Sequence, residues 1–195
     1  MKARLVLADV LAVALMIGCG HEPPPPPPTP PAAPLPPPRN LEEACARWKC
    51  RAPSRVELAT PKGRLVVTEG RTVYSDGEVA RILAGESFAI TGDVQGDRLV
   101  NLRVAGDNAE KDVLLLKFEQ RPLGNEPAMI LTVTNRFPRN VKYRASMQTP
   151  ERKGFYKTSS CPVMAGRQTF EMWPHPIISL MLREVHFIDG RAACN

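Results

Sequence analysis

The sequence predicts an all-β fold, an antiparallel β-sandwich with one short helix at its N-terminal end. From Arg64 onward, apolar and polar residues alternate with a period of two, which is the side-chain period of a strand. Turn-forming groups such as Ser75-Asp76-Gly77 and Gly106-Asp107-Asn108 recur roughly every 8–15 residues. Short alternating segments separated in this way are typical of sandwiches and barrels.

The short helix is expected at Asn40–Trp48. Asn40 is a favourable N-cap residue, and Glu43 follows three positions later, as in a capping box. Leu41 and Trp48 fall on one face of such a helix. Pro53 and the cysteine before it mark the end of the helical stretch.

Nine segments have the alternation expected of strands. They are Arg64–Glu69, Glu78–Leu83, Ser87–Thr91, Arg98–Val104, Asp112–Gln120, Ala128–Thr134, Asn140–Met147, Gly154–Ser159 and Pro176–Asp189. The fifth, sixth and seventh alternate most regularly, and we expect them to form the centre of the sandwich. In the last segment the inward positions change from even to odd numbers near Arg183-Glu184, which predicts a β-bulge there.

One spacing resembles a known architecture. Leu131-x-Val133-x-Asn135 followed by Val141-x-Tyr143 is similar to a hairpin of an immunoglobulin-type sandwich. The Cys…Trp…Cys pattern of true immunoglobulin domains is missing, so the resemblance implies an immunoglobulin-like architecture and no particular family.

The chain begins with a pattern of export. Met1-Lys2-Ala3-Arg4 is basic, residues 5–18 are mostly apolar, and Cys19 follows at once. The run Leu15-Met16-Ile17-Gly18-Cys19 resembles the lipobox of bacterial lipoprotein signal peptides. The resemblance implies that residues 1–18 are removed, that Cys19 carries the lipid that attaches the protein to a membrane, and that Gly20 directs it to the outer membrane. An ordinary cleaved signal with an incidental cysteine is the alternative.

Residues 19–39 are predicted to form a stalk between the lipid and a single domain, 40–195. Of the sixteen residues 23–38, twelve are proline, which lacks an N–H and prevents both helix and sheet. Such a run adopts polyproline II and reaches roughly 50 Å when extended. We interpret it as a spacer; a ligand for a proline-recognising groove is the alternative.

Four cysteines remain after Cys19, an even number that indicates two disulfides in an exported protein. Three connectivities are possible, and we favour the local one, Cys45–Cys50 with Cys161–Cys194. The first pair requires the helix to break between its cysteines. A four-thiolate metal site is the alternative, but the paired C-x-x-C spacing usual for zinc is missing.

The sequence holds no motif of catalysis, and we predict no catalytic residue, metal or cofactor. No nucleophile elbow, phosphate-binding loop or dinucleotide fingerprint is present. Met172 and His175 are candidate copper ligands, but scattered methionines are usually core residues. Asp93 and Asp97 are too few for calcium and suit a hairpin turn. Trp173 is expected to pack in the core or at an edge of the sandwich; exposure to a partner is the alternative.

The positive charge lies in the C-terminal half, where residues 121–195 carry 11 Lys and Arg against 5 Asp and Glu. A basic stretch with interleaved aromatic residues forms a candidate surface for anionic envelope polymers or phospholipid head groups. A solvated strand face is the alternative, since Lys142 and Arg144 would point outward in alternation with Val141, Tyr143 and Ala145, which we expect to be buried. Its basic residues are Arg136, Arg139, Lys142, Arg144, Arg152, Lys153 and Lys157.

These patterns together predict a bacterial outer-membrane lipoprotein that displays a non-enzymatic β-sandwich as a binding or accessory module. Its partner would be an envelope protein complex or an anionic envelope polymer. Nucleic acid fits the charge but not the exported location. The alternative function is an envelope or extracellular enzyme whose active site is assembled from loops.

Overall fold

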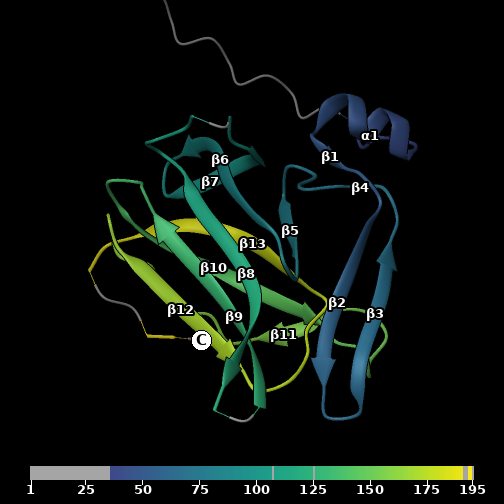
Figure 1. Ribbon diagram of the computed structural model, residues 1–195. Coiled ribbons are helices and arrows are strands. Elements are labelled where there is room, and N and C mark those ends of the chain that lie inside the picture. The colour runs from purple at the N-terminus through teal and green to yellow at the C-terminus, as the bar shows by residue number, and fades with distance from the viewer. Residues whose placement is uncertain (1–35, 107, 125, 191–192, 195) are drawn as a thin grey trace, which may run out of the picture. The chain divides into compact units, whose positions relative to one another are not determined.

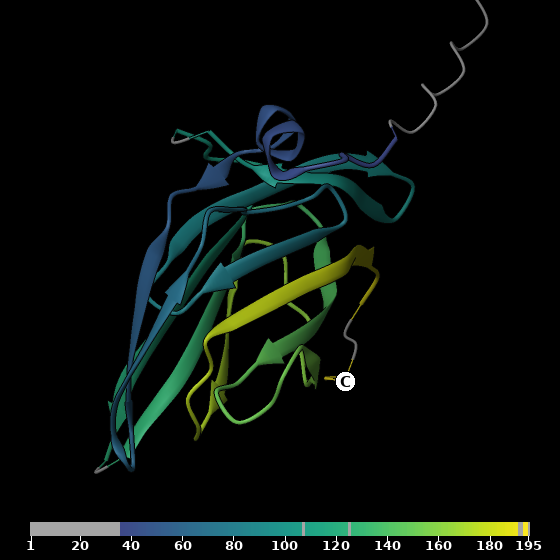
Figure 2. The ribbon, with the colours of Figure 1, turned by 90° about the vertical axis from the view of Figure 1, so that its right-hand side faces the viewer.

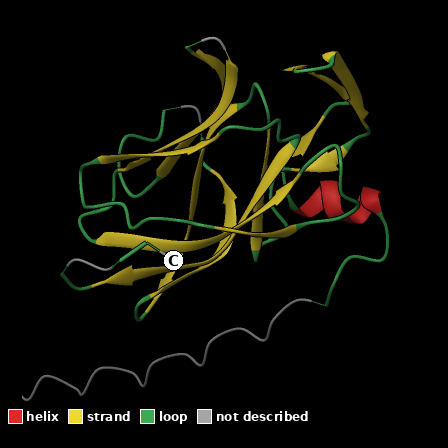
Figure 3. Ribbon diagram, turned by 90° about the horizontal axis from the view of Figure 1, so that it is seen from below, coloured by secondary structure: helices red, strands yellow, loops and turns green. Residues whose placement is uncertain are grey.

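A computed structural model describes residues 36–106, 108–124, 126–190 and 193–194. The signal peptide, Cys19 and nearly all of the stalk lie outside the described residues. The chain from Pro37 onward forms one compact unit. It is mostly antiparallel β-sheet with one short helix, drawn red in Figure 3, and this confirms the predicted all-β, sandwich-like class.

Figure 1 labels the elements of this unit. The described residues form α1 (Leu41–Arg47), β1 (Cys50–Arg51), β2 (Ser54–Thr60), β3 (Gly63–Glu69), β4 (Thr72–Val73), β5 (Val79–Leu83), β6 (Ser87–Gln95), β7 (Arg98–Val104), β8 (Leu114–Leu123), β9 (Glu126–Asn135), β10 (Asn140–Gln148), β11 (Tyr156–Thr158), β12 (Gln168–Trp173) and β13 (Ser179–Ile188).

Nine strands form one curled sheet. Its order is β11-β10-β13-β7-β6-β8-β9-β12, and β5 pairs with the first half of β13. The curl places β10 and β13 opposite β8 and β9, with the core between them (Figure 2). The pairs β2–β3 and β1–β4 form two separate small sheets.

The core is built from the alternation that the sequence shows. Leu114, Leu116 and Phe118 of β8 are fully buried, and so are Val141 and Tyr143 of β10 on the opposite side. Because each strand buries every second side chain, the intervening positions project from the outer surface. Burial of one row of side chains in each strand therefore also determines which residues lie on the outer surface.

The predicted hairpin between β9 and β10 is wrong. The two strands are not neighbours in the sheet, and the chain crosses from one half of it to the other. The buried Asn135 supports this crossing. Its side-chain amide donates to the carbonyls of Arg139 and Val163, at 2.8 and 2.9 Å, and its carbonyl accepts from the Phe137 N–H.

The predicted bulge in the last strand is confirmed. Lys142 lies opposite His186 and Arg144 lies opposite Arg183, so β13 has one residue more than β10 between these pairs. Glu184 adopts a positive φ of 50° at this point. The extra residue returns the inward positions of β13 to the core side.

Two longer strands, β2 and β12, were not predicted. Pro53 and Pro61 flank β2 and resemble breaks in the sequence, although its alternation is regular. In β12 the alternation is inverted, because Glu171 and Trp173 are buried while Phe170 is 61% exposed. The pattern of polar and apolar side chains in β12 therefore does not match its burial, and it does not predict this strand.

The local disulfide pairing is confirmed. Cys45 and Cys50 are bonded, and so are Cys161 and Cys194. The helix begins after the N-cap Asn40, whose side chain accepts from the Glu43 N–H, and it ends at Arg47. The chain therefore turns between the first two cysteines, as their bond requires.

Candidate functional site

Four neighbouring strands, β11, β10, β13 and β7, present basic side chains on the surface opposite to the core. On β10, Val141 and Tyr143 point into the core, so Lys142 and Arg144 project outward. Two of the predicted basic residues are thereby held on the same strand, about 6.8 Å apart along it.

Strand register brings further cations from distant parts of the chain to this surface. Residues directly opposite one another on antiparallel strands share a face. Arg183 lies opposite Arg144, and His186 lies opposite Lys142. Arg98 of β7 lies opposite His186 in turn. The cations of three strands thus lie in adjacent rows, about 4.8 Å apart between strands.

On the other side of β10, β11 extends the same surface. Lys157 lies opposite Ser146 and is exposed, whereas Ser146 itself is only 7% exposed. Lys157 has no ion pair with any residue in the described part of the chain. We call this surface the basic face and define it as Arg98, Lys142, Arg144, Lys157, Arg183 and His186.

Among the described outward positions of these four strands, Glu184 is the one carboxylate. Its Oε2 lies 2.8 Å from Nε of Arg144, and both side chains are about half exposed. An exposed pair of this kind contributes little to stability and leaves Arg144 able to exchange partners. The Lys142 ammonium donates to the Ala193 carbonyl at 3.1 Å. When only its Arg and Lys side chains are counted against Glu184, the basic face has an excess of four positive charges.

Only three of the seven predicted basic residues belong to the basic face: Lys142, Arg144 and Lys157. Arg139 lies after β9, where its guanidinium stacks 4.6 Å from the Phe187 ring and donates to the Gly96 carbonyl. Arg152 stacks 4.9 Å from the ring of Tyr156, and Lys153 is its neighbour in the exposed loop after β10.

Arg136 lies apart from the basic face. It lines a depression of about 480 Å³ with Lys49, Tyr74 and Phe88, among other residues. Its backbone is fixed by hydrogen bonds to the segment that precedes β8, at 2.9 and 3.2 Å. The predicted basic stretch is therefore divided over several surfaces.

Sequence reasoning missed Arg98, Arg183 and His186 as members of the basic face. The alternation of β13 places His186 outside, but nothing in the sequence shows that β7 and β10 flank β13. That neighbourhood follows from long-range pairing, so no local signal could have assembled the three residues.

Comparisons with protein-family models, with curated proteins and with solved structures find no match. The basic face is therefore interpreted from its own chemistry. Among the described residues, no group of three or more His, Cys, Asp or Glu side chains is arranged to hold a metal ion. None of the helices in the described part of the chain has the length and apolar character to span a membrane.

His175 and Trp173 contact other side chains of the domain, whereas Met172 is exposed. The Nε2 atom of His175 lies 3.4 Å from the sulfur of Met147, while Met172 is exposed on β12. Trp173 is buried against Phe118, edge to face, with ring centroids 6.4 Å apart. The expected core packing of Trp173 is confirmed.

Two titratable groups are buried inside the curled sheet. Glu171 accepts a hydrogen bond of 2.5 Å from the Cys161 N–H, yet burial raises the pKa of its carboxyl above the usual 4.5. Burial, followed by the Glu171 charge, raises the pKa of Tyr143, and its hydroxyl has no hydrogen-bond partner among the described residues. Both groups lie away from solvent, so they cannot meet a dissolved polymer.

Proposed function

We propose that the protein is a bacterial outer-membrane lipoprotein whose domain binds an anionic polymer of the envelope through the basic face. The leader and its cysteine support attachment by a lipid, and the proline run supports display at a distance from the membrane. Two disulfides within the domain agree with an oxidising compartment.

The basic face is the observation that carries the binding function. Its cations come from four adjacent strands, with one carboxylate among them. The side chains of Arg98, Arg144 and Lys157 are exposed. Those of Lys142, Arg183 and His186 are half-buried, and Nε of Arg183 is buried. The rows repeat at the spacing of the sheet, so a chain with regularly spaced carboxylates or phosphates can contact several cations at once. An extended surface of this kind suits a polymer better than a small molecule, which requires a concave site.

Polymer binding is tested with a face variant, Arg98→Gln, Lys142→Gln and Lys157→Gln combined. A control variant changes three exposed cations elsewhere, Lys62, Arg71 and Lys111, to Gln, so both lose the same charge. Each is made with Cys19→Ser, to remove the contribution of a lipid, and sedimented with purified bacterial envelope.

The face variant is expected to bind about tenfold more weakly than the control variant, since each exposed contact contributes roughly 0.5 kcal/mol. Raising the salt concentration is expected to reduce the difference, because exposed charges are screened. Equal binding by the two variants would show that net charge, and not the basic face, holds the polymer.

Membrane attachment is tested separately by detergent partitioning of the full chain. The unchanged protein is expected in the detergent phase and the Cys19→Ser variant in the aqueous phase. Partitioning of the variant with detergent would contradict lipid attachment at Cys19.

A further inference from the structure

The two edges of the β2–β3 hairpin differ in whether their outward backbone groups have hydrogen-bond partners. On β2, the Gln120 side chain of β8 satisfies the outward backbone groups of Ala59. The Ala59 N–H donates to Gln120 Oε1 at 2.7 Å, and the Gln120 amide donates to the Ala59 carbonyl at 3.0 Å. The edge of β3 has no such partner among the described residues, since β3 pairs with β2 alone.

The register shows which groups on β3 are free. Thr60 and Gly63 flank a two-residue turn and form the first hydrogen-bonded pair, so bonded and non-bonded pairs alternate from there. Ala59 lies opposite Arg64 in the first non-bonded pair, in agreement with its outward contact to Gln120. The N–H and C=O groups of Arg64, Val66 and Thr68 therefore point away from β2.

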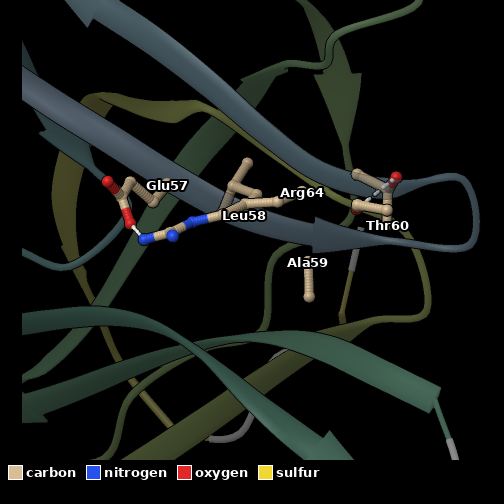
Figure 4. A pocket seen from close by; sticks show the side chains of 6 residues that line it. Glu57, Leu58, Ala59, Thr60 and Arg64 are labelled. Atoms are coloured by element: carbon tan, nitrogen blue, oxygen red, sulfur yellow. Dashed lines mark hydrogen bonds and ion pairs between the residues drawn. The ribbon is translucent and has the colours of Figure 1, made fainter.

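The side chains along this edge leave it open to pairing. No proline and no lysine occurs in Gly63–Glu69, and these are the residues that usually protect an edge strand. The Arg64 guanidinium is engaged by Glu57 of β2, and Figure 4 shows the two reaching toward each other across the hairpin. Val66 is 40% exposed, while Leu65 and Val67 are only partly buried on the inner face.

We propose that β3 pairs antiparallel with β3 of a second copy of this chain, with the two-fold axis at Val66. This register pairs Val66 with its own copy and Arg64 with Thr68 of the other copy, so six backbone hydrogen bonds form. It places Leu65 beside the Val67 of the other copy, which continues the apolar rows of the two hairpins.

The charged side chains of β3 are also compatible with this register. Arg64 faces a threonine, and the inward Glu69, which is held by Arg81 at 3.1 Å, faces Gly63 of the other copy. No like charges become direct neighbours across the new pair. One pair of seven-residue strands forms a smaller contact than the roughly 1,200–2,000 Å² of a stable interface, so the association is weak and transient.

A weak symmetric contact is tested by covalent trapping of the full chain. Val66→Cys is combined with Cys19→Ser, which removes the remaining cysteine outside the two disulfides. Across a hydrogen-bonded pair the Cα atoms lie about 5.5 Å apart, within the range of a disulfide. The control is Glu57→Cys, on the same outer face and one strand further from the axis, where the distance of about 14 Å prevents bonding.

Mild oxidation is expected to give at least tenfold more covalent dimer for Val66→Cys than for Glu57→Cys. A second measurement follows the sedimentation of the chain with Val66 unchanged, at increasing concentration, beside Val66→Lys, which places two like charges on the axis. The unchanged chain is expected to form dimers and the variant to stay monomeric. Equal trapping at both cysteines, or sedimentation unaffected by Val66→Lys, would overturn the proposal.

Discussion

Glu86→Gln is expected to lower the free energy of unfolding by about 3 kcal/mol, because it leaves a buried guanidinium without its counter-charge. The Arg51 side chain is 2% exposed, and its Nε lies 3.0 Å from Oε1 of Glu86. Burial lowers the pKa of Arg51 and raises the pKa of Glu86, so both charges are held against a desolvation cost. The amide keeps the shape of the carboxylate but removes its charge and one of its two acceptor oxygens. A single oxygen cannot both face Arg51 and accept from the Leu83 N–H, which donates to Oε2 of Glu86 at 2.7 Å.

The remaining contacts of Arg51 reduce the loss of stability in Glu86→Gln, but they do not replace the negative charge of the carboxylate. Its Nη2 donates to the Arg81 carbonyl at 2.5 Å, and its guanidinium stacks 4.4 Å from the Tyr74 ring. Its Nη1 has no hydrogen-bond partner among the described residues. We therefore expect a value near the lower end of the range of about 3–5 kcal/mol for breaking a buried pair.

Urea unfolding measures this change. With a slope of about 2 kcal/mol per molar urea, a loss of 3 kcal/mol moves the midpoint down by about 1.5 M. Glu57→Gln is the control, since Glu57 is 34% exposed and its pairs with Arg55 and Arg64 lie at the surface. Its expected effect is below about 1 kcal/mol.

Equal midpoints for Glu86→Gln and Glu57→Gln would refute the reasoning. The combined replacement Arg51→Met with Glu86→Leu separates charge from packing. It removes both charges, so the domain is expected to remain within about 1 kcal/mol of the unchanged protein. A loss as large as that of the single variant would show that packing, and not the unpaired charge, explains the effect.

Two further changes test the core and the sheet. Burial raises the pKa of Glu171, so the folded state binds this proton more tightly than the unfolded state and stability falls as pH rises from about 4.5 through the folded pKa. Glu171→Gln is therefore expected to raise the melting temperature at pH 7 and to remove part of the gain on acidification; a parallel pH profile would contradict this. Gly92→Ala is expected to cost about 1–3 kcal/mol in urea unfolding, because the new Cβ would lie 2.5 Å from the Val100 carbonyl oxygen. Gly70→Ala, with no atom within 4 Å, is the control and should change stability by less than about 0.5 kcal/mol; equal losses would argue against the close contact.

The strand faces could be predicted from the sequence where the alternation is local. Leu114 and Leu116, and the bulge near Glu184, follow from side-chain period alone. The neighbours of each strand could not be predicted, because pairing is decided by contacts far apart in the chain. The β9–β10 hairpin was expected from a spacing that resembles an immunoglobulin-type hairpin, whereas the chain crosses the sheet there and the buried Asn135 bonds to backbone carbonyls of the crossing.

The same division applies to the candidate site. Lys142 and Arg144 were predicted as outward residues because they alternate with buried neighbours on one strand. Arg98 and Arg183 join them only through the register of β13 with β7 and β10. Arg136 was grouped with them by sequence distance, yet the crossing after β9 carries it to another surface.

The central claim is that the basic face binds an anionic envelope polymer. It is tested most directly by mapping, with amide NMR shifts, the residues that the polymer contacts. The Cys19→Ser chain, labelled with ¹⁵N, is titrated with soluble polysaccharide released from purified bacterial envelope. Binding through the basic face predicts that the largest shifts cluster at Arg98, Lys142, Lys157 and Arg183. Shifts centred on the depression lined by Arg136, or spread evenly over exposed cations, would contradict the claim.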